Sequence, residues 1–177
     1  MIEKSLLVVL PVVNFNEQEY LIVKRTFEQS YFKLFIASDA GSLCTGQNGL
    51  RVGSDVSFFN INHKNFASIV FIGGAGVRKY WNNSLLHSKI NSFNHAQKPI
   101  GAICSAPIIL ARAGLLTNQN ATCHPEDKSV MMNMNIHYID SPVVISGNVI
   151  TAQGPESAEQ FSEVIIEKIM EHFSHFR

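Results

Sequence analysis

The residue with the clearest chemical potential is Cys104, which stands at a change of sequence pattern. An apolar, strand-like segment at residues 100–103 ends at this cysteine, and Ser105, Ala106 and Pro107 lead into an apolar segment that stops at Gly114. Proline is favoured at the start of a helix and glycine just past its end, so the pattern predicts a strand, a tight turn and a helix. A turn of this kind lifts a side chain to the edge of a sheet. Its helix amides and dipole would favour a thiolate.

The structural alternative is that Cys104 packs as a small buried hydrophobe, which is common for free cysteine. The small residues around it and the change from strand to helix favour the nucleophile interpretation.

A glycine-rich segment, Gly73-Gly74-Ala75-Gly76, follows the apolar residues 68–72. It has neither the lysine nor the glycine spacing of a phosphate-binding loop. It is either an ordinary turn or a place where the backbone approaches the sulfur closely. In the second case the N–H groups of Gly74 and Ser105 would form an oxyanion hole.

Two carboxylates, Glu17 and Glu19, follow the first apolar run. Solvated acidic residues are favoured in the first turn of a helix, which is the structural explanation for both. An ionised carboxylate beside Cys104 would raise the pKa of the thiol, whereas a protonated one could donate to the sulfur. A catalytic glutamate here must therefore share a proton with Cys104.

His124 is one of seven histidines and ends a predicted short strand about twenty residues after Cys104. Histidine beside cysteine is the usual means of activating a thiol. A lone histidine is more often structural, and His137 is the second candidate.

The elements that would position these residues alternate between strand and helix. Strands are expected at residues 6–13, 34–37, 68–72 and 100–103, and helices at 17–29 and 81–96. Residues 38–53 are expected to form a loop with a short strand at 50–52. Gly147-Asn148 predicts a hairpin between strands at 143–146 and 149–152, and Ser157 with Gln160 predicts a capping box for the last helix. The pattern predicts an α/β fold, in which the residues that follow parallel strands converge at one sheet edge.

Composition narrows the class of protein. A chain of 177 residues suits one domain, residues 1–177. Fourteen basic and fourteen acidic residues balance, which predicts no nucleic-acid partner, and residues 6–13 are too few to span a membrane. Three cysteines, Cys44, Cys104 and Cys123, form no disulfide framework or metal motif, so we expect a cytoplasmic protein without a bound metal.

The combination of Ala102-Ile103-Cys104-Ser105-Ala106-Pro107, Gly73-Gly74 and Thr122-Cys123-His124-Pro125 resembles the DJ-1/PfpI (ThiJ) superfamily. The resemblance covers nearly the whole chain. It implies a flavodoxin-like three-layer sandwich, with a mostly parallel sheet and helices on both faces, and a homodimer. It also implies Cys104, Glu19 and His124 as catalytic residues, with Glu17 as the alternative to Glu19.

The implied activity is cysteine-dependent, cofactor-free chemistry on small reactive carbonyls or glycated substrates, of the glyoxalase or deglycase type, in stress protection. The alternative is a redox sensor, chaperone or binding protein that uses oxidised Cys104. The peptidase-like branch has histidine directly after the cysteine, where this chain has Ser105. His124-Pro125-Glu126 resembles a motif of glutamine amidotransferases, which is a further, weaker alternative.

Overall fold

The computed structural model of the chain describes residues 4–39 and 43–174. A seven-stranded sheet forms its centre and is parallel except for one edge strand. In spatial order its strands are β11 (Val143–Ser146), β12 (Val149–Ala152), β8 (Ile100–Ile103), β7 (Ser68–Phe71), β1 (Ser5–Val9), β3 (Lys33–Ser38) and β6 (Val56–Ser57).

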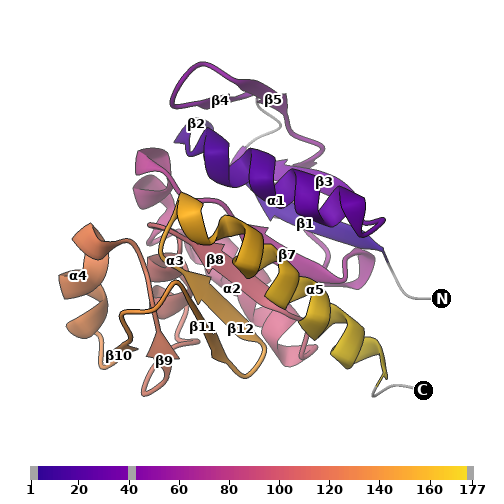
Figure 1. The fold of residues 1–177 in the computed structure, drawn as a ribbon. Coiled ribbons are helices and arrows are strands. Elements are labelled where there is room, and N and C mark those ends of the chain that lie inside the picture. Colours follow the sequence, from indigo (N-terminus) through magenta and orange to yellow (C-terminus); the bar gives the residue numbers. More distant parts are fainter. Residues whose placement is uncertain (1–3, 40–42, 175–177) are drawn as a thin grey trace.

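Helices cover both faces of this sheet (Figure 1). α1 (Glu17–Gln29) and α5 (Ala158–Ser174) run beside each other over one face, and α2 (Ser84–His95) and α3 (Pro107–Arg112) lie on the other. Alternate residues of β1 enter different cores: Leu6 packs on the α1–α5 side and Leu7 on the α2–α3 side. A strand buried on both faces is apolar on both, which explains why residues 6–9 of β1 are all apolar. The predicted flavodoxin-like α/β fold is confirmed.

The predicted first strand, residues 6–13, is too long. β1 ends at Val9, and a separate strand, β2 (Val13–Phe15), begins after Pro11. Pro11 has no N–H to donate to a sheet ladder, and the chain turns here away from the central sheet. β2 joins a three-stranded sheet with β4 (Leu43–Gly46) and β5 (Arg51–Gly53). The segment predicted as loop therefore contains this β4–β5 hairpin, and its residues 40–42 lie outside the described residues.

The second long helix also differs from its predicted range of 81–96. Residues Ala75–Tyr80 form a 3-10 helix, and α2 begins only at Ser84, where Asn83 Oδ1 accepts the N–H of Leu86 at 2.9 Å. An asparagine with this hydrogen bond is a favoured helix start. The connection from β7 thus has one extra helical segment, which carries Trp81 at its end.

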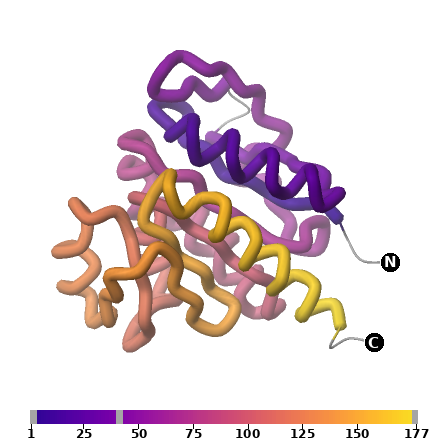
Figure 2. Tube along the Cα trace, in the orientation of Figure 1, coloured from indigo at the N-terminus to yellow at the C-terminus, as the bar shows by residue number. Residues whose placement is uncertain are grey.

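After α3 the chain forms a two-stranded sheet, the hairpin at the edge of the central sheet and the helix α5, and Figure 2 shows its path as a tube. The predicted hairpin of β11 and β12 is confirmed. The strand expected near His124 lies earlier, as β9 (Asn120–Ala121), and pairs with β10 (His137–Tyr138). α4 (Lys128–Met132) lies between these two strands in the sequence. Ser157 belongs to a 3-10 turn, Pro155–Ser157, that leads into α5.

Candidate active site

Cys104 occupies the turn between β8 and α3, at the carboxyl-terminal edge of the central sheet. Its backbone has φ of 63°, a left-handed conformation that is strained for cysteine, and its N–H donates to the Ala152 carbonyl at 2.9 Å. Strain of this kind persists only where the surrounding structure enforces it, and it is characteristic of nucleophile turns. The side chain is 6% exposed. The sequence pattern located this turn correctly.

The two glycines after β7 allow the backbone to approach Cys104. A Cβ on Gly73 would stand 2.4 Å from Cys104 Cβ, and Gly74 has φ of 108°. Only glycine fits both the space and the backbone conformation. The N–H groups of Gly74 and Ser105 both donate to the sulfur of Cys104. The sequence analysis named the same two N–H groups as oxyanion donors, and that role stays a prediction.

Glu19 lies in the first turn of α1 and is completely buried. Asn16 Oδ1 caps the helix by accepting the Glu19 N–H at 3.1 Å, and Gly73 N–H donates to Glu19 Oε2 at 2.8 Å. The carboxyl lies within hydrogen-bonding range of the Cys104 thiol, although Oε1 has no partner of ordinary hydrogen-bond geometry within the described residues. A buried oxygen without a donor disfavours the ionised carboxylate.

Burial raises the pKa of Glu19 from 4.5 to about 7, and the hydrogen bonds from Gly73 and Cys104 reduce the shift. Burial also raises the pKa of the Cys104 thiol, and the negative charge of Glu19 raises it further. The N–H groups of Gly74 and Ser105 act in the opposite direction. The amides of the turn therefore lower the pKa of this thiol as expected, but burial outweighs them and the net shift is upward.

These shifts make Glu19 and Cys104 one titrating pair. The pair releases its first proton near pH 7 and holds the second to much higher pH. Around neutrality one proton is thus shared between a carboxyl and a thiol. The amides of Gly74 and Ser105 favour a thiolate beside a carboxylic acid, whereas the Gly73 amide favours the carboxylate.

Glu17, the alternative to Glu19, points elsewhere. Its Oε1 accepts the N–H groups of Asn48 at 2.7 Å and Leu50 at 2.8 Å in the β4–β5 turn. Glu17 is therefore a structural residue, and Glu19 is the carboxyl that lies against the sulfur.

His124 lies close to Cys104 through the backbone, since its N–H donates to the Cys104 carbonyl at 2.7 Å. Its Nδ1 accepts the N–H of Glu126 at 3.3 Å, so a neutral His124 carries its proton on Nε2. His137, the second candidate, is exposed on β10 and does not line the Cys104 pocket. The carboxylate of Glu126 pairs with Arg78 at 3.5 Å rather than with the imidazole, so the geometry gives no support to an amidotransferase-like pair.

The side chains meet in a pocket of about 270 Å³. Its lining residues are Asn16, Gln47, Gly74, Ala75, Arg78, Cys104, Ser105, His124 and Glu126. The volume suits a molecule of a few heavy atoms. Sequence reasoning missed Asn16, Gln47 and Arg78, of which only Asn16 had a signal, as the residue before a helix start. Gln47 and Arg78 reach the pocket through tertiary structure alone.

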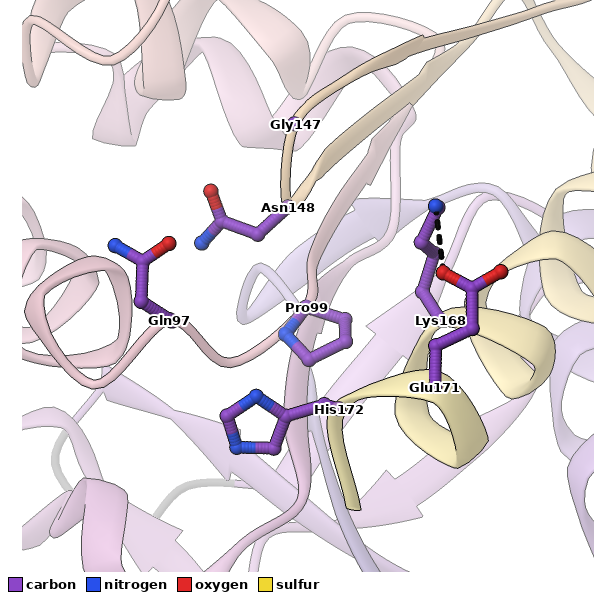
Figure 3. Close-up of a pocket in the computed structure, with 7 residues that line it drawn as sticks. All are labelled: Gln97, Pro99, Gly147, Asn148, Lys168, Glu171 and His172. Atoms are coloured by element: carbon purple, nitrogen blue, oxygen red, sulfur yellow. Dashed lines mark hydrogen bonds and ion pairs between the residues drawn. The ribbon is translucent and has the colours of Figure 1, made fainter. Parts of the chain in front are cut away.

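A second pocket, of about 330 Å³, lies at the other end of β8 (Figure 3). Pro99 stands directly before that strand, and Lys168 and Glu171 of α5 form an ion pair at 2.7 Å. The pocket contains no cysteine and lies away from the strained turn, so the Cys104 pocket remains the candidate active site.

Across residues 4–39 and 43–174, no group of three or more histidine, cysteine or acidic side chains is arranged to hold a metal ion. Within the same residues, no helix is long and apolar enough to cross a membrane.

Fold and site together define an α/β protein with a strained cysteine at a strand-to-helix turn and a buried glutamate against its sulfur. Comparison with known proteins gives the class a name: residues 4–168 match the DJ-1/PfpI family, and the chain belongs to that family.

Three relatives illustrate the similarity. An uncharacterized protein of Methanocaldococcus jannaschii is 31% identical over 94% of this chain and 82% of its own length. The glutathione-independent glyoxalase DJR-1.2 of Caenorhabditis elegans is 28% identical over 94% of this chain and 89% of its own. A ThiJ/PfpI domain protein of Brachyspira murdochii has a solved structure with a TM-score of 0.91 and 28% identity, covering 95% of this chain and 97% of that one.

Proposed function

We propose that this protein is an enzyme that converts small reactive 2-oxoaldehydes, or the adducts they form with amines, into 2-hydroxy acids. The observation that carries the proposal is the fully buried carboxyl of Glu19 beside the sulfur of Cys104, at a strained strand-to-helix turn. Similarity to proteins named glyoxalase and deglycase supports the same class of substrate. The scheme below uses only residues of this chain and water.

In the first step, the proton of the pair rests on Glu19 and the Cys104 thiolate attacks the aldehyde carbon. A C–S bond forms, and the carbonyl electron pair moves onto oxygen, which takes the proton from Glu19 to give a hemithioacetal. The N–H groups of Gly74 and Ser105 stabilise the charge that develops on that oxygen. The thiolate is a strong nucleophile at neutral pH, and an aldehyde carbon is an electrophile that it can attack.

In the second step, the carboxylate of Glu19 removes the proton from the carbon bonded to sulfur. The electron pair moves toward the neighbouring ketone, and an enediolate forms. The hydroxyl proton of the first carbon moves to the oxygen of the second, and Glu19 returns its proton to the second carbon, which gives the thioester of a 2-hydroxy acid and leaves Glu19 as a carboxylate. One carbon is oxidised and its neighbour reduced, so no external oxidant is needed.

Hydrolysis completes the cycle. Water, held by the Nε2–H of His124 and deprotonated by the carboxylate of Glu19, attacks the thioester carbon, the C–S bond breaks, and the thiolate leaves. A glycated amine enters the same route when its C–N bond breaks and the amine departs with a proton. A general base within reach of the water contributes a typical ~100- to 10,000-fold in rate.

The test is turnover of methylglyoxal to lactate by the wild type, Cys104→Ser and Cys44→Ser. Cys44 is a buried cysteine of β4 that does not line the Cys104 pocket, which makes it a matched control. Activity that is lost in Cys104→Ser and kept in Cys44→Ser supports the proposal. Equal activity in wild type and Cys104→Ser would reject a cysteine nucleophile.

A redox role for the same residue is the second candidate. Two N–H groups and a carboxyl at the sulfur would also stabilise a sulfinic acid, whose oxygens accept hydrogen bonds and whose proton can be shared with Glu19. Mass spectrometry after limiting peroxide, with binding assays on the oxidised form, tests this role. It is favoured only if oxidised protein gains an activity that reduced protein lacks.

We further propose a homodimer in a reducing, cytoplasmic environment. All three cysteines are free, which fits such an environment. Light scattering at micromolar concentration tests the dimer, and a monomer mass alone would reject it.

A further inference from the structure

Trp81, the only tryptophan of the chain, links two loops that meet at Cys104. It directly follows the 3-10 helix Ala75–Tyr80, which continues from Gly74. Its indole Nε1–H donates to the carbonyl of Ser105 at 2.8 Å. One side chain thus connects the glycine loop with the turn that carries the nucleophile.

This link matters because the two N–H donors on the sulfur come from different loops. The Gly74 N–H belongs to the segment after β7, and the Ser105 N–H to the segment after β8. Hydrogen-bond donors stabilise a developing charge well only when their spacing is fixed in advance. A bond to the Ser105 carbonyl restrains the orientation of that residue, and with it the direction of its N–H.

The indole ring of Trp81 is itself contacted by two arginine side chains. The guanidinium carbons of Arg78 and Arg112 lie 5.9 Å and 5.8 Å from the ring centroid. Arg78 is anchored at 3.0 Å by the buried carboxylate of Asp127, and Arg112 donates to Asn82. Cations at this distance attract an aromatic ring, so both contacts restrict the motion of the indole.

We propose that Trp81 is a positioning residue that fixes the spacing of the Gly74 and Ser105 N–H groups around the Cys104 sulfur. It acts through Ser105 and does not touch substrate. The proposal rests on the proposed function only for its turnover measurement, since the reactivity of the thiol can be measured without any substrate.

Trp81→Phe removes the indole N–H and keeps an aromatic ring. We expect kcat for methylglyoxal to fall about 10- to 100-fold with KM changed less than about threefold, because removing an oxyanion-hole donor outright costs ~100- to 1,000-fold. Alkylation of Cys104 by iodoacetamide should slow at every pH, and its pH profile should move to higher pH. Tyr80→Phe is the matched control, because the Tyr80 hydroxyl accepts a hydrogen bond from Val12 rather than from the turn. Its alkylation profile should match the wild type.

A second measurement uses the wild-type fold. Because Trp81 is the only tryptophan, a single indole N–H resonance reports on its hydrogen bond. Alkylation of Cys104 should shift that resonance, and iodoacetamide should leave it unchanged in Cys104→Ser. An alkylation profile of Trp81→Phe that superimposes on the wild type, or an indole resonance indifferent to Cys104 alkylation, would overturn the proposal. Absence of dicarbonyl turnover would instead count against the proposed function alone.

Discussion

Glu17 and Glu19 stand two residues apart in the first turn of α1, and their carboxyls serve different parts of the protein. Glu17 accepts two N–H groups of the β4–β5 turn, at 2.7 Å and 2.8 Å. Glu19 is buried against Cys104 and accepts the Gly73 N–H at 2.8 Å. Residues two apart on a helix point in different directions, so two identical side chains have different roles in the folded protein.

The first prediction contrasts these two residues. Glu19→Gln keeps the size and the acceptor for Gly73 and cannot exchange a proton, so kcat should fall at least about 100-fold. Glu17→Gln should change kcat less than about tenfold, since its carboxyl only supports a turn at the pocket rim. Steady-state turnover of methylglyoxal measures both. A larger loss in Glu17→Gln than in Glu19→Gln would contradict the assignment.

The second prediction concerns the pH dependence of activity. Glu19 has its pKa raised to about 7, so below that pH the pair carries both protons and no thiolate. Turnover and alkylation of Cys104 should therefore rise as the pH increases through about 7. Glu19→Gln should lack this step. A wild-type profile that is flat between pH 5 and 8 would refute the shared proton.

The third prediction concerns stability. The pKa of Glu19 is higher in the folded protein, about 7, than its ordinary 4.5, so the folded state binds the proton more tightly. This favourable contribution is complete below pH 4.5 and is lost as the pH rises through about 7, a difference of roughly 3 kcal/mol. The free energy of unfolding of Glu19→Gln, measured in urea, should fall less than that of the wild type across this range. Parallel curves for the two proteins would disprove the effect.

The fourth prediction tests the close approach at Gly73. In Gly73→Ala the added Cβ would meet Cys104 Cβ at 2.4 Å and the Ile103 carbonyl at 2.8 Å, neither of which can move freely. Overpacking of this kind typically costs about 1–3 kcal/mol, and the displaced sulfur should lose its reactivity. Gly53→Ala is the control, because nothing lies within 4 Å of its added Cβ. Thermal unfolding and iodoacetamide labelling should separate the two variants.

The fifth prediction concerns selectivity among the cysteines. Cys104 lines a pocket and is 6% exposed, whereas Cys44 and Cys123 are fully buried. Burial raises the pKa of all three thiols, so access to the sulfur is what distinguishes them. Limiting peroxide at pH 8 should therefore oxidise Cys104 first, as read by peptide mass spectrometry. First oxidation of Cys44 or Cys123 would show that the turn does not expose a reactive sulfur.

The sequence by itself determined the α/β class and the turn at Cys104, whereas the need for glycine at positions 73 and 74 is known only from the structure. The class and the turn can be predicted because each depends on residues that are neighbours in the sequence. The relevant features are apolar runs buried on two faces, a proline at a helix start and small residues at a tight turn. The same reasoning overextended the first strand, because the run of apolar residues continues past Pro11 while the sheet ladder does not.

Only the tertiary structure decided which glutamate faces the sulfur, and how the thiol titrates. The choice between Glu17 and Glu19 depends on what packs against α1, which neighbouring residues in the sequence do not encode. The pKa of Cys104 depends on burial by strands and loops far apart in the chain, and this burial outweighs the amides that the turn supplies locally. The same holds for Gln47 and Arg78, which line the pocket, and for Trp81, which contacts the turn at Ser105. Their side chains arrive there across loops that meet only in the folded chain.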